Sequence, residues 1–263
     1  MKSASSLLLL LIFTSVTYGQ VRLAKLVIKP KEVYELKGSD ILVVDSLIMM
    51  DSSVFLLNKL KAENFIHART IVFYRGSLID GKGVAGLPGR NGRVGPSSSS
   101  PCSDGGSGTM GTDGTYGANG TNVFMSFSDI ILKGVPTIDV SGGDAGDGGN
   151  GGSGGGGGSG TRLCVGGSGG TGGAGSNGGN GGNGGTITFH AASIPELRSM
   201  LGERIIIHNY GGNLGLGGEG GSGGYAGLNP TGKNSLDGKQ GRKGAHGKDG
   251  VVGKLGAINF QEK

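Results

Sequence analysis

The chain contains no tryptophan, only 7 prolines and 2 cysteines, and aromatic residues make up 5% of its 263 residues. The shortage of proline excludes a collagen-like triple helix, which needs proline-rich triplets around each glycine. After residue 20, no apolar run reaches the roughly 20 residues that cross a bilayer, so no membrane span is predicted. No metal site is predicted either, because metal-ligand spacing is absent among the four histidines, His67, His190, His208 and His246.

The first 19 residues have the three-part layout of a secretory signal peptide. Lys2 supplies the positive start, an apolar core follows, and Thr17 and Gly19 place small residues where a signal peptidase cuts before Gln20. The apolar core, Leu7 to Phe13, is too short for a permanent anchor. We therefore expect a protein that is secreted, extracellular or at the cell surface.

The cysteines and the net charge are interpreted for an exported chain. Two cysteines in an exported chain, Cys102 and Cys164, predict one disulfide, with two free thiols as the alternative. The formal charge of +5 becomes +4 once Lys2 leaves with the signal peptide. A charge this modest matters only where basic residues cluster.

Short bursts of β-branched residues recur along the chain and predict strands. In return strands such as Ile187-Thr188-Phe189, apolar and polar residues alternate with the strand period of two. The recurring unit of return strand, first strand and second strand predicts a mainly β and extended fold, a short parallel β-helix with three strands per turn. Ser193, as N-cap, and Pro195 predict a short helix from Pro195 to Leu201.

These repeats divide the chain into segments. A signal peptide occupies 1–19, an N-terminal cap and the first β-helix rungs 20–82, and a terminal strand 257–263. Between them, at 83–256, glycine-rich hairpins alternate with strand rungs. The hairpins span 83–120, 143–184 and 212–256, and the interleaved rungs span 121–142 and 185–211.

Glycine, at 62 residues, recurs at every third position in six runs, two for each hairpin. Polyproline II has three residues per turn, so such spacing makes a glycine stripe that lets another backbone approach closely. We expect the three hairpins to form a six-helix polyproline-II or polyglycine-II bundle. The middle hairpin is nearly Gly-Gly-x and should be central, so Gly172 and Gly181 should tolerate a side chain less than Gly241 in the last run. Cys102 and Cys164 fall in the breaks of neighbouring hairpins and would tie their tips together.

With this periodicity the chain resembles the polyglycine-II bundle proteins, among them the springtail (snow flea) antifreeze proteins and the tips of phage tail-fibre adhesins. The likeness covers about residues 83–256 and rests on the Gly-x-x and Gly-Gly-x repeats. It implies a rigid bundle with either an adhesive or an ice-binding role. The interleaved strands depart from the springtail proteins, and the signal peptide departs from the phage tips.

The strand coil itself is similar to pectate-lyase-type β-helices, so a carbohydrate-active enzyme is the third hypothesis. Asp80 and Asp139 stand where turns begin, which favours a turn-forming role over a catalytic one. Gly-rich phosphate loops, catalytic triads and complete calcium-binding nonapeptides are absent from the sequence. We predict that the protein is not an enzyme and has no cofactor.

Two surface patterns remain as candidate sites. A ladder of threonines would form an ice face, with the hydroxyls repeating every turn of the helix: Thr109, Thr112 and Thr115. Exposed basic residues on the outer runs and a tip would bind an acidic polysaccharide or another cell-surface polymer, with no specific nucleic acid: Arg90, Arg93, Arg162, Arg242, Lys243 and Lys248. We rank the structural or adhesive role first, ice binding second and an enzyme last. The sequence does not fix the oligomeric state.

Overall fold

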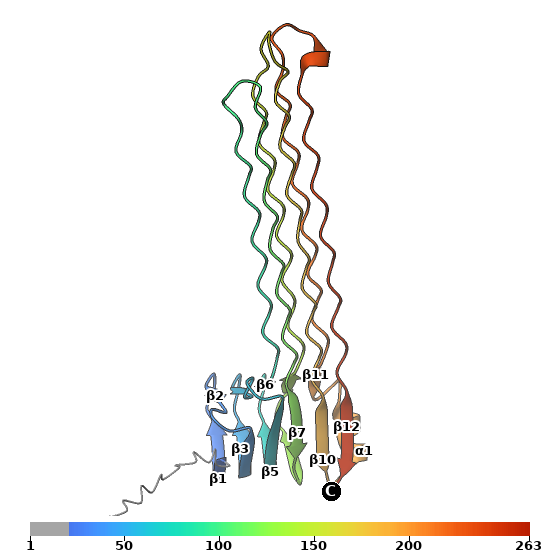
Figure 1. The fold of residues 1–263 in the computed structure, drawn as a ribbon. Coiled ribbons are helices and arrows are strands. Elements are labelled where there is room, and N and C mark those ends of the chain that lie inside the picture. Colours follow the sequence, from blue (N-terminus) through green and yellow to red (C-terminus); the bar gives the residue numbers. More distant parts are fainter. Residues whose placement is uncertain (1–20) are drawn as a thin grey trace, which may run out of the picture.

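The structure is a computed structural model that describes residues 21–263, so the predicted signal peptide at 1–19 lies outside the described residues. A base of β-strands carries long extended segments that project side by side from one end (Figure 1). Within residues 21–263, helix is confined to α1 (Ile194–Met200) and the short 3-10 turn η1 (Asn234–Leu236). The predicted mainly β and extended fold class is confirmed.

The strands of the base pair in parallel to form two sheets. Sheet A has the order β1 (Val21–Ile28), β3 (Ile41–Met49), β5 (Glu63–Phe73), β7 (Asn122–Ser126), β10 (Ile187–Ala191) and β12 (Ile258–Glu262), and β8 (Asp129–Leu132) also pairs with β5. Sheet B has the order β2 (Val33–Glu35), β4 (Val54–Leu56), β6 (Leu78–Asp80), β9 (Thr137–Asp139) and β11 (Ile206–His208). The chain alternates between the sheets, so it coils as it advances.

Alternating side chains of the two sheets fill the interior of this coil. In β3, for example, buried and partly exposed residues alternate, as expected where one face of a strand packs on a core. The largest fully buried side chains come from both sheets and from the turns between them: Phe55, Phe73, Phe127, Phe189, Leu42, Leu47, Ile66 and Ile71. These apolar contacts stack rung upon rung and hold the base together.

The prediction of three strands in every turn is wrong for part of the coil. β7, β8 and β9 do form three separate strands, but β5 runs unbroken and pairs with β7 through 63–67 and with β8 through 70–73. Between its two paired stretches β5 has only Ala68 and Arg69, neither of which is a turn former, whereas two serines flank Phe127 between β7 and β8. In the next turn α1 takes the place of the middle strand. The structure has this helix at the predicted place, with proline in its first turn, but Ser193 makes no side-chain capping hydrogen bond.

Six extended segments form the projection. Segments 1, 3 and 5 (83–97, 141–159 and 210–228) lead away from sheet B, and segments 2, 4 and 6 (104–121, 166–186 and 238–257) return to sheet A. Backbone hydrogen bonds recur at every third residue, for example from Gly108 N to Thr171 O at 2.8 Å and from Gly152 N to Thr109 O at 2.9 Å. Since extended chains without internal hydrogen bonds must satisfy their polar groups on neighbours, these bonds hold the segments together.

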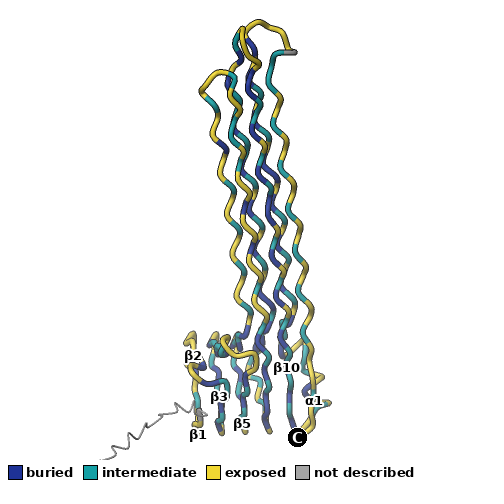
Figure 2. Tube along the Cα trace, in the orientation of Figure 1, coloured by how far each residue is buried: buried dark blue, intermediate teal, exposed yellow. Residues whose placement is uncertain are grey.

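The hydrogen bonds arrange the segments in two layers. Segments 1, 3 and 5 bond in parallel in one layer, segments 2, 4 and 6 bond in parallel in the other, and consecutive segments bond across the layers in antiparallel. Segments 3 and 4, the middle hairpin, each bond to four other segments, whereas segments 1 and 6 each bond to two. Buried residues accordingly recur along the middle of the projection (Figure 2).

The register of the sheets continues into the projection. Parallel partners in β7 and β10 are 64 residues apart, and so are Asn119 and Asn183 higher up in segments 2 and 4. Partners in β10 and β12 are 71 residues apart, as are Asn183 and Lys254 in segments 4 and 6. The base thus sets which residues lie beside one another along the whole projection.

The glycine stripes face neighbouring backbones throughout. A Cβ atom added to Gly172 would overlap the carbonyl oxygen of Gly221, and one added to Gly181 would overlap that of Gly212. The expectation that Gly241 is more tolerant is wrong, because a Cβ there would overlap the carbonyl oxygen of Gly170. An outer segment exposes its side chains but still turns its glycine stripe inward.

Candidate binding surface

Each layer presents one broad face on which side chains stand in rows. We call the outward side chains of segments 2, 4 and 6 the return face, and those of segments 1, 3 and 5 the outgoing face. On the return face Asp113, Asn177 and Lys248 form one row, and Asn119, Asn183 and Lys254 form another. The side chains are exposed while the backbone behind them is hydrogen-bonded, so the spacing between rows is fixed by the backbone.

Most aspartates and asparagines of these rows serve the fold. The Asn183 side-chain oxygen Oδ1 accepts a hydrogen bond from Lys254 N at 2.8 Å, and the next amide, Gly184 N, donates to Lys254 O at 2.8 Å. We call this pair of bonds to one residue of the adjacent parallel segment an Asx clamp. The clamp satisfies a backbone N–H group of the adjacent segment that the recurring glycine hydrogen bonds leave unpaired. Sequence reasoning missed these residues, although repeated Asn-Gly and Asp-Gly pairs in step with the glycine period were a signal for them.

The predicted basic residues are all exposed, but the structure does not bring all six together. Arg242 and Lys248 lie in one column on the return face of segment 6, together with Lys239 and Lys254. Lys243 occupies the position that faces segment 5, where Asp249 Oδ1 accepts from Gly217 N at 2.7 Å. On the far side of the projection, segment 1 carries Arg90 and Arg93, and the tip carries Arg162. Within residues 21–263, none of the six forms a salt bridge.

The tip of the projection is held by covalent and polar links. The predicted disulfide between Cys102 and Cys164 is present, with Cα atoms 6.1 Å apart, and it joins the first and second hairpins. Buried Asn229 joins the second and third hairpins, because its side-chain amide Nδ2 donates to Thr161 O at 2.9 Å and its backbone N donates to Asp237 Oδ1. All three tips are therefore linked, while Leu163 and Arg162 remain exposed.

The predicted threonine ladder lies along the seam between segments 1 and 2. The hydroxyl oxygens of Thr109, Thr112 and Thr115 accept hydrogen bonds from the backbone N–H groups of Arg93, Arg90 and Leu87, at 2.7, 2.8 and 2.6 Å. The three hydroxyls thus perform for segment 1 the same task that the Asx clamps perform elsewhere. They are aligned as expected, but each has its oxygen engaged by the protein.

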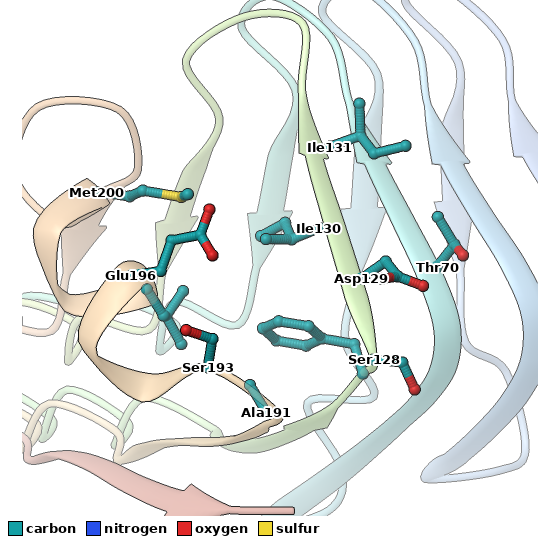
Figure 3. A pocket seen from close by; sticks show the side chains of 11 residues that line it. Thr70, Ser128, Asp129, Ile130, Ile131, Ala191, Ser193, Glu196 and Met200 are labelled. Carbon is teal, nitrogen blue, oxygen red and sulfur yellow. The ribbon is translucent and has the colours of Figure 1, made fainter.

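A cleft of about 370 Å³ opens beside α1 (Figure 3). It exists because α1 replaces a strand, which leaves β8 paired with β5 alone among the described strands. Its walls combine apolar side chains such as Ile130 and Met200 with the carboxylates of Asp129 and Glu196. No group of three or more metal-ligating side chains occurs within residues 21–263. The cleft offers two acids and hydroxyl groups but no assembled nucleophile and base.

The two aspartates considered for catalysis have structural partners. Asp80 Oδ1 accepts from Lys82 N at 2.9 Å and pairs with Lys59, and Asp139 Oδ1 accepts from Ser141 N at 2.9 Å. Both are turn aspartates at the points where segments 1 and 3 leave sheet B.

Two histidines, His67 and His190, flank Phe124 on the outside of sheet A, with ring centroids 5.9 Å from the phenyl ring. His190 Nδ1 lies 3.0 Å from Ser126 Oγ. Burial lowers the pKa of His67 below its usual 6.5, and the charges of His190 and Lys263 lower it further. The packing of His67 and the neighbouring charges thus disfavour its charged form.

Comparisons with protein-family models, with curated proteins and with solved structures gave no match for this chain. No helix within residues 21–263 is long and apolar enough to cross a membrane.

Proposed function

We propose that the protein is a secreted structural or adhesive protein, in which a short parallel β-helix carries a six-helix polyglycine-II bundle that presents side chains to an extracellular polymer. The observation that carries the proposal is the shared register of base and projection. Because the offsets of 64 and 71 residues hold in both, each exposed side chain has a fixed place on a rigid support. Linked tips keep the far end of that support together.

The chemistry of the return face favours an acidic polymer. Lys239, Arg242, Lys248 and Lys254 stand in one column of segment 6, and successive triplets of a polyproline-II chain are about 9 Å apart. Neighbouring segment 4 contributes uncharged Asn177, Asn180 and Asn183 rather than acids. An extended polyanion lying along segment 6 would meet several cations with little opposing charge beside them.

The experiment compares two matched pairs of substitutions. Arg242→Gln with Lys248→Gln removes charge from the return face, and Arg90→Gln with Arg93→Gln removes the same charge from the opposite edge. We expect the first pair to weaken binding to immobilised alginate, a soluble polyuronate, and the second pair to leave it nearly unchanged. Binding should fall as salt rises, because exposed charges are screened beyond about 8 Å at physiological ionic strength.

Neutral dextran serves as the control polymer, and circular dichroism checks that both variants keep their fold. Equal losses for the two pairs would mean that binding follows net charge alone and would refute a site on the return face. Binding that survives both pairs and high salt would leave Arg162 and Leu163 at the tip as the contact residues to test next.

Ice binding is the second candidate, supported by the alignment of Thr109, Thr112 and Thr115. It ranks lower because the three hydroxyl oxygens accept backbone hydrogen bonds. Measured thermal hysteresis that disappears in Thr112→Tyr would reverse the ranking. The adhesive proposal expects no thermal hysteresis in the unmodified protein.

A further inference from the structure

Six Asn-Gly pairs in the bundle share one arrangement: Asn91-Gly92, Asn119-Gly120, Asn150-Gly151, Asn177-Gly178, Asn180-Gly181 and Asn183-Gly184. In each pair the asparagine Oδ1 accepts from the backbone N of one residue in the adjacent parallel segment, at 2.8–2.9 Å. The glycine N donates to the carbonyl oxygen of that same residue, at 2.7–2.9 Å. Both reactive ends of the Asn-Gly unit are therefore tied to the neighbouring backbone.

These two ends are the groups that react in deamidation. The glycine nitrogen attacks the asparagine side-chain carbon Cγ, the new N–Cγ bond forms, and the Cγ–Nδ2 bond breaks; the glycine nitrogen gives up its proton to water, and the leaving nitrogen takes a proton from water and departs as ammonia. Water then opens the cyclic imide to aspartate or isoaspartate. Glycine favours the attack because it has no side chain to obstruct the ring. The reaction requires the glycine nitrogen to leave its hydrogen bond and turn toward Cγ, which an extended backbone held on both sides does not allow.

We propose that the six Asn-Gly pairs are latent deamidation sites that the Asx clamps protect, so that deamidation marks a local opening of the bundle and the isoaspartate product makes that opening permanent. The chain itself shows which product fits. Asp104, Asp113 and Asp147 already occupy the same clamp position before a glycine, and each accepts the same backbone hydrogen bond. The aspartate product can therefore re-form the clamp. Isoaspartate adds one atom to the backbone, shifts the three-residue period beyond it, and prevents the segment from closing again.

The order of modification follows from the number of supporting segments. Asn91 lies in segment 1, which bonds to two other segments, whereas Asn177, Asn180 and Asn183 lie in segment 4, which bonds to four. Local opening costs less where fewer neighbours must be released. Asn91 should be modified first among these four, and the pairs of segment 4 last. This inference is independent of what the surface binds.

The test is peptide mapping by mass spectrometry after incubation in a mildly alkaline buffer. One sample is the folded protein, and its control is the same chain reduced and kept unfolded in guanidinium chloride. We expect all six pairs to deamidate at least about tenfold more slowly in the folded protein, since each 1.4 kcal/mol of opening free energy is a factor of ten. The variant Gly155→Ala, which disturbs the contact between segments 1 and 3, should accelerate modification of Asn91 and Asn150.

Two results would overturn the proposal. Equal rates in the folded and unfolded samples would show that the clamps give no protection. Modification of Asn177 before Asn91 in the folded protein would show that protection does not depend on the supporting segments. Separation of the aspartate and isoaspartate products adds a further check, because refolded material should keep the aspartate form and exclude the isoaspartate form.

Discussion

Two adjacent glycines of segment 3 give the sharpest test of how the extended segments pack together. A Cβ atom on Gly155 would overlap the carbonyl oxygen of Pro96 in segment 1. On Gly156, the nearest atoms to an added Cβ are Ser97 Oγ at 3.7 Å and Tyr225 O at 3.8 Å, which is ordinary contact. The substitutions Gly155→Ala and Gly156→Ala therefore differ by one position and by the presence of a facing backbone.

The two substitutions should change the free energy of unfolding in opposite directions. Gly155→Ala must separate segments 1 and 3, which costs about 1–3 kcal/mol for overpacking. It also strains the bonds from Gly155 N to Gly106 O and from Gly170 N to Gly155 O, both 2.8 Å long, at about 0.5–1.5 kcal/mol each. Gly156→Ala meets no obstacle and restricts the unfolded chain, so it should stabilise the protein by about 0.4–1 kcal/mol.

Thermal unfolding followed by circular dichroism or calorimetry measures the difference. At about 2–4 °C per kcal/mol for a chain of this size, the summed cost of about 2–6 kcal/mol means that Gly155→Ala should lower Tm by roughly 4–24 °C, and Gly156→Ala should raise it slightly. Gly157→Ala, which would overlap the carbonyl oxygen of Gly167, should behave like Gly155→Ala. Equal Tm losses for Gly155→Ala and Gly156→Ala would refute the packing of glycine stripes on neighbouring backbones.

Three further outcomes are expected. Replacing Cys102 and Cys164 with serine should lower the free energy of unfolding by about 4 kcal/mol for a sequence separation of 62; calorimetry checks this, and no change in Tm relative to the oxidised protein would contradict a role for the linked tips. Asn183→Ala should cost about 1 kcal/mol by removing the acceptor for Lys254 N, while Asn183→Asp keeps it; equal Tm values for the two variants in thermal melts would argue against the Asx clamp. Because the pKa of His67 is lowered, the unfolded chain binds more protons than the folded chain between the lowered pKa and 6.5. Stability should thus decline as pH falls below about 6.5, and His67→Gln should flatten that part of a denaturation-versus-pH curve.

The local chemistry of the base was predictable where side-chain patterns were periodic. The alternation in Ile187-Thr188-Phe189 predicted a strand, and β10 is present with Ile187 and Phe189 buried. Pro195 predicted the helix α1. The length of β5 was not visible in the sequence, because it depends on β7 and β8 pairing with the two ends of one continuous strand.

For the candidate surface, too, the sequence predicted local features but not which segments are neighbours. A period of three identified the exposed residues of each run, so Arg242, Lys248, Arg90 and Arg93 are all at the surface. Their distribution between opposite sides of the bundle depends on which segments are neighbours. The expected tolerance of Gly241 failed for a related reason, since a stripe on an outer segment still packs against the backbone of segment 4.

By itself, the sequence determined the three-residue period and the positions of strand β10 and helix α1, because each follows from residues close in the chain, and a count of two cysteines predicted the pairing of Cys102 with Cys164. Only the tertiary structure decided which segments, and which residues on them, lie beside one another. The offsets of 64 and 71 residues between parallel partners are set by loop lengths and by stacking of the coil, and they determine which asparagine meets which backbone amide. Contacts between residues so far apart in the sequence depend on how whole segments pack, and a local sequence pattern does not predict that packing.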